Sequence, residues 1–164
     1  MNRIKVINEP SDLVPILRAV DTLTKKEVFK ELTHSWLTEK EIGKKYGKEG
    51  LQALRLFEKM RLVETKWQAG DDGPVKAYHA FYTSLHISAS SPVTEISDVL
   101  IVAMMPDKDY KKLEDRIYEA IGKQGKFAGD LAEELDMSQI MLRSVIKRSF
   151  RLDFRGHRVE RFES

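Results

Sequence analysis

The stretch TEKEIGKKYGKEGLQALRLFEKMRLV, residues 38–63, decides the fold of this chain. Thr38 followed three residues later by Glu41 is a capping-box pattern, which predicts the start of a helix, and Gly47 suits the left-handed turn that ends one. Another helix is predicted over residues 51–63, because apolar side chains recur there at helical spacing. These side chains are Leu51, Leu54, Leu56 or Phe57, and Met60.

The flanking sequence supplies the other parts of a recognisable unit. A short amphipathic helix is predicted over residues 13–20 with Ser11 or Asp12 as N-cap, and a second over residues 24–32 with Thr24 as cap. Residues 63–67 and 77–82 read as strands that are joined by a loop at Gly70-Asp71-Asp72-Gly73-Pro74. Helices closed by such a hairpin predict a winged helix, a variant of the helix-turn-helix.

The second half of the chain repeats this plan in miniature. Helices are expected over residues 110–121, 127–135 and 138–150, and Arg155-Gly156-His157 could turn a hairpin between two short strands. Between the halves, residues 96–105 form a strongly apolar run. It is either a helix that forms core for both halves or half of a dimer interface.

The predicted fold class is therefore mainly α with small β-hairpin wings, in which two winged-helix modules are joined by an apolar linker element. The expected domains are residues 11–84, an N-terminal winged-helix DNA-binding domain, and residues 107–164, a C-terminal winged-helix-like domain. Residues 85–106 between them are expected to be a linker or dimerisation element.

Composition excludes several classes of protein. The 164 residues are 41% hydrophobic and 33% charged, which is typical of a globular protein. The absence of cysteine excludes disulfides, thiolate catalysis and zinc fingers. No apolar stretch approaches the roughly eighteen residues that a membrane helix needs, and the N-terminus lacks a signal-peptide pattern, so we expect a cytoplasmic protein without membrane contact.

Two segments carry a resemblance to a known family. Residues 54–64, followed by a Gly-Pro-containing wing and then residues 76–83, resemble the ArsR-type winged-helix regulators over about residues 12–84. The tandem arrangement resembles archaeal-type two-headed regulators. The resemblance implies transcriptional control, but the paired cysteines through which such proteins sense metalloids are missing, so any effector would be an unknown small molecule.

Several side chains are candidates for DNA contact. Gln52 and Arg55 could reach base edges, and the nearby cations suit phosphates. These cations are Lys44, Lys45, Lys48 and Lys59, with Lys76 on the wing. The corresponding candidates in the second module are Gln139, Arg143, Lys147 and Arg148. The basic segment from residue 143 to 161 could bind DNA, the interpretation we favour, or pair with acidic residues such as Asp130, Glu133 and Glu134.

Other features favour ordinary packing. His79, His86 and Asp98 have the chemistry of a metal site but no spacing signature, so no metal or cofactor is predicted. Trp67, Tyr78, Phe81 and Tyr82 could line a ligand pocket, but sealing the wing onto the helices is the favoured interpretation. No catalytic motif is found, and we expect no enzyme activity.

The expected function is a DNA-binding transcriptional regulator that acts as a homodimer on double-stranded DNA and represses by occlusion. Two alternatives remain open. One is a winged-helix protein-interaction module in a transcription or repair assembly, because fold does not fix function. The other is a ligand- or metal-gated sensor.

Overall fold

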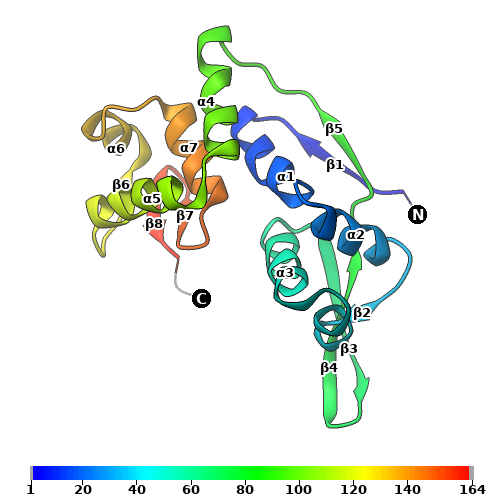
Figure 1. Cartoon of the computed structure of the whole chain (residues 1–164). Helices are drawn as coiled ribbons and strands as arrows, with labels where there is room; N and C mark the ends of the chain where they lie inside the picture. The colour runs from blue at the N-terminus through cyan, green and yellow to red at the C-terminus, as the bar shows by residue number, and fades with distance from the viewer. Residues whose placement is uncertain (1, 163–164) are drawn as a thin grey trace. The chain divides into compact units, whose positions relative to one another are not determined.

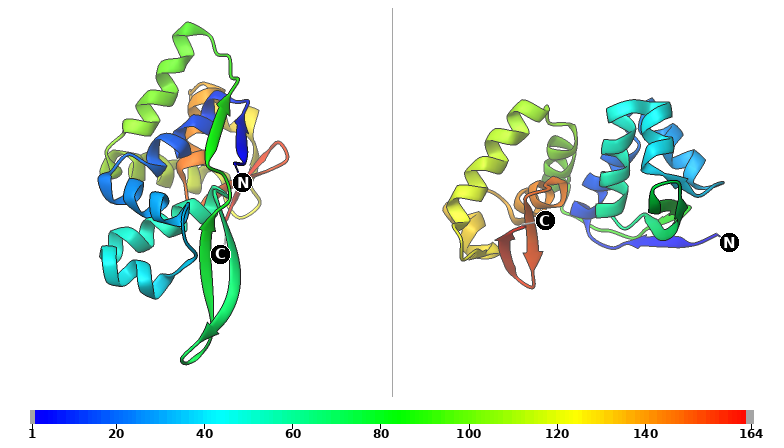
Figure 2. Two further views of the ribbon diagram at one scale, coloured as in Figure 1. Left: turned by 90° about the vertical axis from the view of Figure 1, so that its right-hand side faces the viewer. Right: turned by 90° about the horizontal axis from the view of Figure 1, so that it is seen from below.

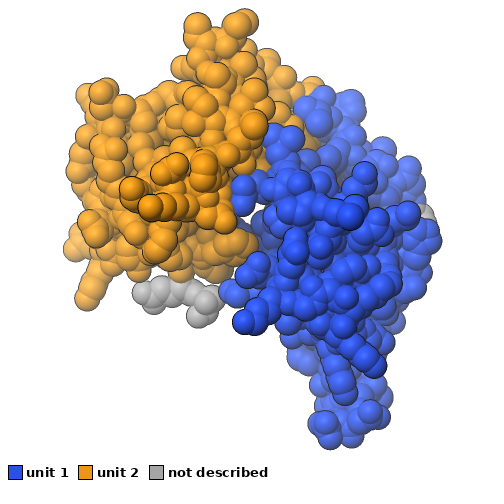
Figure 3. Space-filling model, in the orientation of Figure 1, with its two compact units in different colours: residues 1–6, 16–87 blue, residues 7–15, 88–164 orange. Residues whose placement is uncertain are grey.

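The computed structural model describes residues 2–162 and divides them into two compact units (Figure 3). The first unit comprises residues 2–6 and 16–87, and the second comprises residues 7–15 and 88–162. The boundary near the N-terminus falls within helix α1, Leu13–Ala19, which follows a short 3-10 turn at Pro10–Asp12 (η1). Each unit has its own hydrophobic core.

The first unit combines helices with a three-stranded antiparallel sheet (Figure 1). Its elements are the end of α1, then α2 (Leu23–Leu32), β2 (Leu37–Thr38), α3 (Glu39–Lys59), β3 (Val63–Gly70) and β4 (Gly73–Ala80). The sheet order is β2-β4-β3. Val28, Leu32 and Phe57 are fully buried at the centre of the core, where the Phe29 and Phe57 rings meet edge to face at 5.2 Å.

Helix α3 consists of two helical segments that meet at a kink at Gly47. That residue has φ 67° and ψ −152°, outside the helical region and in a part of backbone space that is essentially restricted to glycine. At the start of the helix, the Thr38 hydroxyl accepts from Glu41 N while the Glu41 carboxylate accepts from Thr38 N, so the predicted capping box is confirmed. The helical segment after Gly47 therefore runs in a different direction from the segment before it.

The hairpin of β3 and β4 is longer than the sequence indicated. Pairing runs without interruption from Val63 opposite Ala80 to Gly70 opposite Gly73. Only Asp71 and Asp72 form the turn, so the predicted five-residue loop at the tip is wrong. The hairpin extends past the helices of its unit (Figure 2).

A second small sheet in this region was not predicted. Strand β1 (Ile4–Ile7) pairs with β5 (Ser84–Ile87), which follows β4. Ile4, Val6 and Ile87 are each more than half exposed on it.

The second unit repeats the order of helices followed by a hairpin. It contains α4 (Val93–Met104), α5 (Asp107–Ile121), β6 (Lys126–Phe127), α6 (Ala128–Glu134), α7 (Gln139–Arg148), β7 (Leu152–Arg155) and β8 (Arg158–Arg161). The sheet order β6-β8-β7 corresponds to that of the first unit. Ile117, Leu131 and Leu142 are fully buried in the core. The predicted hairpin turn around Gly156 is confirmed.

The apolar run between the halves is helical. One side of α4 is buried in the second unit through Val99, Val102 and Ala103. The opposite side leaves large apolar side chains exposed: Val93, Ile96, Leu100, Ile101 and Met104. Among residues 2–162, no helix is both long enough and apolar enough to cross a membrane.

Two predicted helix starts need correction. The N-cap of α2 is Thr22, whose side chain accepts from Lys25 N, and not Thr24. Starting the helix earlier adds the backbone bond from Lys26 N to Thr22 O. Neither Ser11 nor Asp12 caps α1, because both lie inside the 3-10 turn that leads into it.

Candidate nucleic-acid interface

The second half of α3 has one buried face and one polar face. Ala53, Leu54 and Phe57 are buried. Four polar side chains, spaced four, three and four residues apart, are exposed: Lys48, Gln52, Arg55 and Lys59. This spacing places them on a single side of the helix. The sequence prediction for these four residues therefore corresponds to one exposed, cationic stripe.

Two further predicted cations lie on the first half of α3. Lys44 and Lys45 are both exposed. The Lys45 ammonium donates to the Glu31 carboxylate of α2, and this hydrogen bond lowers the pKa of Glu31 and raises the pKa of Lys45. Because the Lys45 side chain is 60% exposed to water, the pair contributes little to stability and can exchange for another anion.

The β3–β4 hairpin, called the wing from here on, is attached to α3 by two side chains of β4. The Tyr78 hydroxyl donates to Glu39 Oε1 at 2.9 Å, and the Lys76 ammonium donates to the Glu58 carboxylate. Burial of Tyr78, together with the bond to Glu39, raises the pKa of its phenol well above the usual range, so Tyr78 remains a donor. These contacts hold the lower half of the hairpin, as far along as Lys76, against both ends of the helix. Lys76 is half-buried and already paired.

The outer face of the wing holds a stack of side chains. The Lys66 ammonium lies 4.2 Å from the centroid of the Trp36 ring, and Trp36 stacks on His79 at 5.1 Å. His79 Nδ1 lies 3.5 Å from Glu64 Oε1. Lys66 is therefore engaged by an aromatic face of its own unit.

Helix α7, the second candidate recognition helix, is enclosed by its own unit on most sides. Leu142, Val145 and Ile146 are buried. The two cations on its remaining face are paired with the segment before α1: Arg143 lies 3.7 Å from Glu9, and Lys147 lies 3.2 Å from Asp12. Only Gln139, at its first turn, is exposed.

This arrangement was compared with known proteins. A family model described as ArsR transcriptional regulator matches residues 7–163. The chain belongs to the ArsR family. The match confirms the resemblance seen in residues 54–64 and 76–83, and it extends across both units. A search of curated proteins found no match. Regulation by proteins of the ArsR family involves DNA, so the exposed stripe of α3 is the relevant surface to consider.

For this ArsR-family protein, the prediction that Arg148 contacts DNA is wrong. Its side chain is only 4% exposed, and its guanidinium donates to the carbonyls of Val102 and Met105 and to Asp107. The guanidinium also lies 4.1 Å from the centroid of the Tyr110 ring. Arg148 therefore joins α4, α5 and α7 inside the second unit.

The basic segment that follows is also satisfied internally, contrary to the interpretation favoured from sequence. Arg151 Nε donates to Glu114 at 2.9 Å, and its guanidinium also bonds Asp115. Arg158 donates to backbone carbonyls at residues 124 and 125, and Arg161 donates to Tyr118 O. The acidic residues that bind Arg151 are Glu114 and Asp115, whereas the sequence suggested Asp130, Glu133 and Glu134 as partners for this segment.

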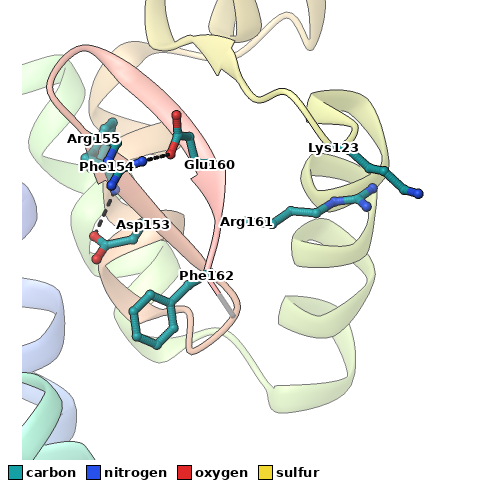
Figure 4. A pocket seen from close by; sticks show the side chains of 7 residues that line it. All are labelled: Lys123, Asp153, Phe154, Arg155, Glu160, Arg161 and Phe162. Atoms are coloured by element: carbon teal, nitrogen blue, oxygen red, sulfur yellow. Dashed lines mark hydrogen bonds and ion pairs between the residues drawn. The ribbon is translucent and has the colours of Figure 1, made fainter. Parts of the chain in front are cut away.

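A cavity of about 680 Å³ lies against the hairpin of the second unit (Figure 4). It is lined by charged side chains of both signs and by two phenylalanines: Lys123, Asp153, Phe154, Arg155, Glu160, Arg161 and Phe162. Arg155 lies 3.6 Å from Glu160, and Asp153 accepts from the backbone of Phe154. The Arg155 and Glu160 charges are therefore paired with each other within the hairpin.

The first unit holds a smaller and mainly apolar cavity of about 270 Å³. It is lined by α1, α2 and the chain around β5, through Ile16, Ala19, Val20, Phe29, Leu62, Tyr82, Thr83, Ser84 and Leu85. Leu62 connects it to α3, because Leu62 N donates to Phe57 O in the turn that ends this helix. Within the described chain, no cluster of three His, Asp or Glu residues could hold a metal ion.

Proposed function

We propose that this ArsR-family regulator binds duplex DNA through its first unit, with the second half of α3 in the major groove and the β3–β4 hairpin beside it. The observation that carries the proposal is the exposed stripe of Lys48, Gln52, Arg55 and Lys59 on a helix whose other face is core. Gln52 and Arg55, in the middle of the stripe, are assigned to base edges. Lys44, Lys45, Lys48 and Lys59 are assigned to phosphates.

The apolar side of α4 supports assembly into a homodimer. Val93, Leu100 and Met104 are between 49% and 89% exposed, and their spacing places them on one side of the helix. Contiguous apolar surface of this kind marks an interaction site. A second copy packed there would present two recognition helices to a two-fold DNA site, and repression would follow from occlusion of the promoter.

We also propose that both units are winged helices, since each has the same sheet order behind its helices. Their roles would differ. Arg143 and Lys147 would have to leave Glu9 and Asp12 to contact phosphate, whereas Arg55 of the first unit forms no ion pair with another described residue. We therefore assign DNA contact to the first unit and leave Gln139, Arg143 and Lys147 as secondary contacts.

The test uses fluorescence anisotropy of a labelled duplex from the region upstream of the protein's own gene, at several salt concentrations. Arg55→Ala should weaken binding by about 1–3 kcal/mol. Lys48→Ala should reduce the slope of log affinity against log salt by about one. Lys26→Ala, an exposed cation on α2, is the matched control and should change neither.

Two results would contradict the proposal. Equal losses from Arg55→Ala and Lys26→Ala would mean that α3 is not in the groove. Absence of duplex binding at low salt would instead favour a protein-interaction module, because the non-specific phosphate contribution is strongest there.

The apolar cavity favours a second function, the gating of DNA binding by a small neutral ligand. Titration calorimetry with benzene and with indole tests it directly. Val20→Phe should fill the cavity and abolish binding, whereas Leu17→Phe, three residues earlier and exposed to a similar extent but not in the cavity wall, should not. Loss of binding in both variants, or in neither, would exclude this cavity as the site.

A further inference from the structure

The chain has two tryptophans, and they lie in very different surroundings. Trp36 is half-buried between Lys66 and His79. Trp67, in the middle of β3, is 71% exposed. The sequence favoured a packing role for Trp67 at the base of the wing, and the structure corrects this, because the hairpin carries Trp67 beyond the core.

The register of the hairpin fixes which side Trp67 is on. It lies opposite Lys76, two residues along from the pair of Thr65 and Tyr78. Residues two apart on a strand share a face, so Trp67 shares the face that carries Lys76 and Tyr78. Both of these side chains reach α3, through Glu58 and Glu39. Trp67 is therefore on the side of the wing that faces α3.

The tip of the wing is unsuited to phosphate. Asp71 and Asp72 form the turn and are exposed. Two carboxylates at this position repel the DNA backbone, so the tip cannot hold the duplex in the way that a basic tip would. Trp67 lies four residues before Asp71, roughly 13 Å back along the strand. The wing thus offers an apolar contact set back from an acidic tip.

We propose that Trp67 is the contact of the wing with the duplex, its indole lying in the minor groove against deoxyribose and base edges. This inference rests on the proposed function and adds to it the nature of the wing contact. Apolar side chains are used in this way by proteins that bind the minor groove. The indole N–H is a donor, and the floor of the minor groove at A·T pairs presents only acceptors. A·T pairs beside the α3 site should therefore be preferred over G·C pairs.

A contact of this kind changes the affinity for duplex DNA without changing how that affinity depends on salt concentration. Cations that neutralise phosphates release counterions, whereas an indole releases none. Trp67→Ala should weaken duplex binding roughly tenfold, an amount typical of a lost aromatic contact, and leave the salt slope unchanged. Lys48→Ala should lower the slope of log affinity against log salt concentration by about one. Because Trp67 is largely exposed, its removal should not change the unfolding midpoint.

Two single-tryptophan variants give an independent measurement. Trp36→Phe leaves Trp67 as the only indole, and Trp67→Phe leaves Trp36. Titration with the upstream duplex should quench or shift the emission of Trp67 and leave the emission of Trp36 unchanged. Binding itself is followed on the same samples by anisotropy of a label on the DNA.

The outcomes separate this inference from the proposed function. If the labelled duplex binds while Trp67 emission stays constant and Trp67→Ala binds as tightly as the parent chain, the inference is overturned and DNA binding by α3 stands. If Trp67 emission changes with protein concentration in the absence of DNA, the indole is covered by a second copy, which also overturns the inference. If no duplex binds at low salt, both proposals fail.

Discussion

Replacement of Gly50 by alanine tests how the second half of α3, the proposed recognition helix, is positioned. Gly50 is buried where the two halves of α3 meet. A Cβ atom built there lies 2.5 Å from Tyr46 Cβ and 3.1 Å from Ile42 Cγ2. The Tyr46 Cβ atom is attached directly to the backbone and cannot rotate away, so the two halves of the helix must separate. Gly50→Ala should therefore destabilise the first unit and move the second half of α3.

The magnitude follows from two opposing effects. Overpacking of this kind costs roughly 1–3 kcal/mol, while glycine to alanine within a helix gains about 0.5–1 kcal/mol. We expect a net loss of about 1–2 kcal/mol in the free energy of unfolding. Gly43→Ala is the matched control, because its Cβ would meet only Leu51 side-chain atoms at 3.5 Å, an ordinary contact. That variant should be unchanged or more stable by up to about 1 kcal/mol.

The assay is urea denaturation followed by tryptophan fluorescence. Both indoles, Trp36 and Trp67, belong to the first unit, so the signal reports its unfolding separately from that of the second. Gly50→Ala should also lose duplex affinity, whereas Gly43→Ala should keep it. The steric reasoning is refuted if Gly50→Ala unfolds at the same urea concentration as the parent chain, or if the two variants are equally destabilised.

Three further variants test other contacts. Gly47→Ala should lower the free energy of unfolding, measured by urea denaturation, by roughly 1–3 kcal/mol. The loss should come entirely from backbone strain at φ 67°, since the added Cβ would have no neighbour within 4 Å. An unchanged unfolding midpoint would contradict this explanation. Exchanging both Asp71 and Asp72 for lysine should raise duplex affinity and steepen its salt dependence in anisotropy titrations, unless the tip lies away from the DNA. The hydrogen bond from Arg151 lowers the pKa of Asp115, so the stability it contributes is present above pH 3.8 and is lost as pH falls through the folded-state pKa. Asp115→Asn should therefore be less stable than the parent at pH 7, and the difference in urea midpoint should close in strong acid.

The parts of the fold predicted from sequence are those set by local interactions. The capping box at Thr38, the break in the helix at Gly47 and the hairpin turn at Gly156 each depend on residues within a few positions. The pairing of β1 with β5 joins residues about eighty positions apart, and neither segment shows a long alternating pattern. Such pairing is decided by the rest of the fold, so inspection of short windows could not reveal it.

The same distinction explains the site. The polar stripe of α3 follows from helical spacing alone, and the sequence identified all four of its residues. The partners of Arg148 and Arg151 lie 36 to 46 residues away, so counting charges along the chain could not show that these guanidinium groups are already used. Trp67 was misjudged because the strands were predicted to end too early. With the hairpin extended to Gly70, a residue expected at the base lies well along the wing.

The two units show how one topology can present different surfaces. Each unit combines its helices with a three-stranded sheet, and the strands of the two sheets are arranged in a corresponding order. In the second unit, the segment before α1 brings Glu9 and Asp12 to the polar face of α7, where they meet Arg143 and Lys147. In the first unit, Glu31 and Glu58 pair with Lys45 and Lys76, at the margins of the stripe, and Gln52 and Arg55 are exposed in its middle. Cations on a helix therefore indicate a nucleic-acid surface only when they are not already paired with acids of their own unit. Among the described residues, Arg55 meets that condition, whereas Arg143 and Lys147 do not.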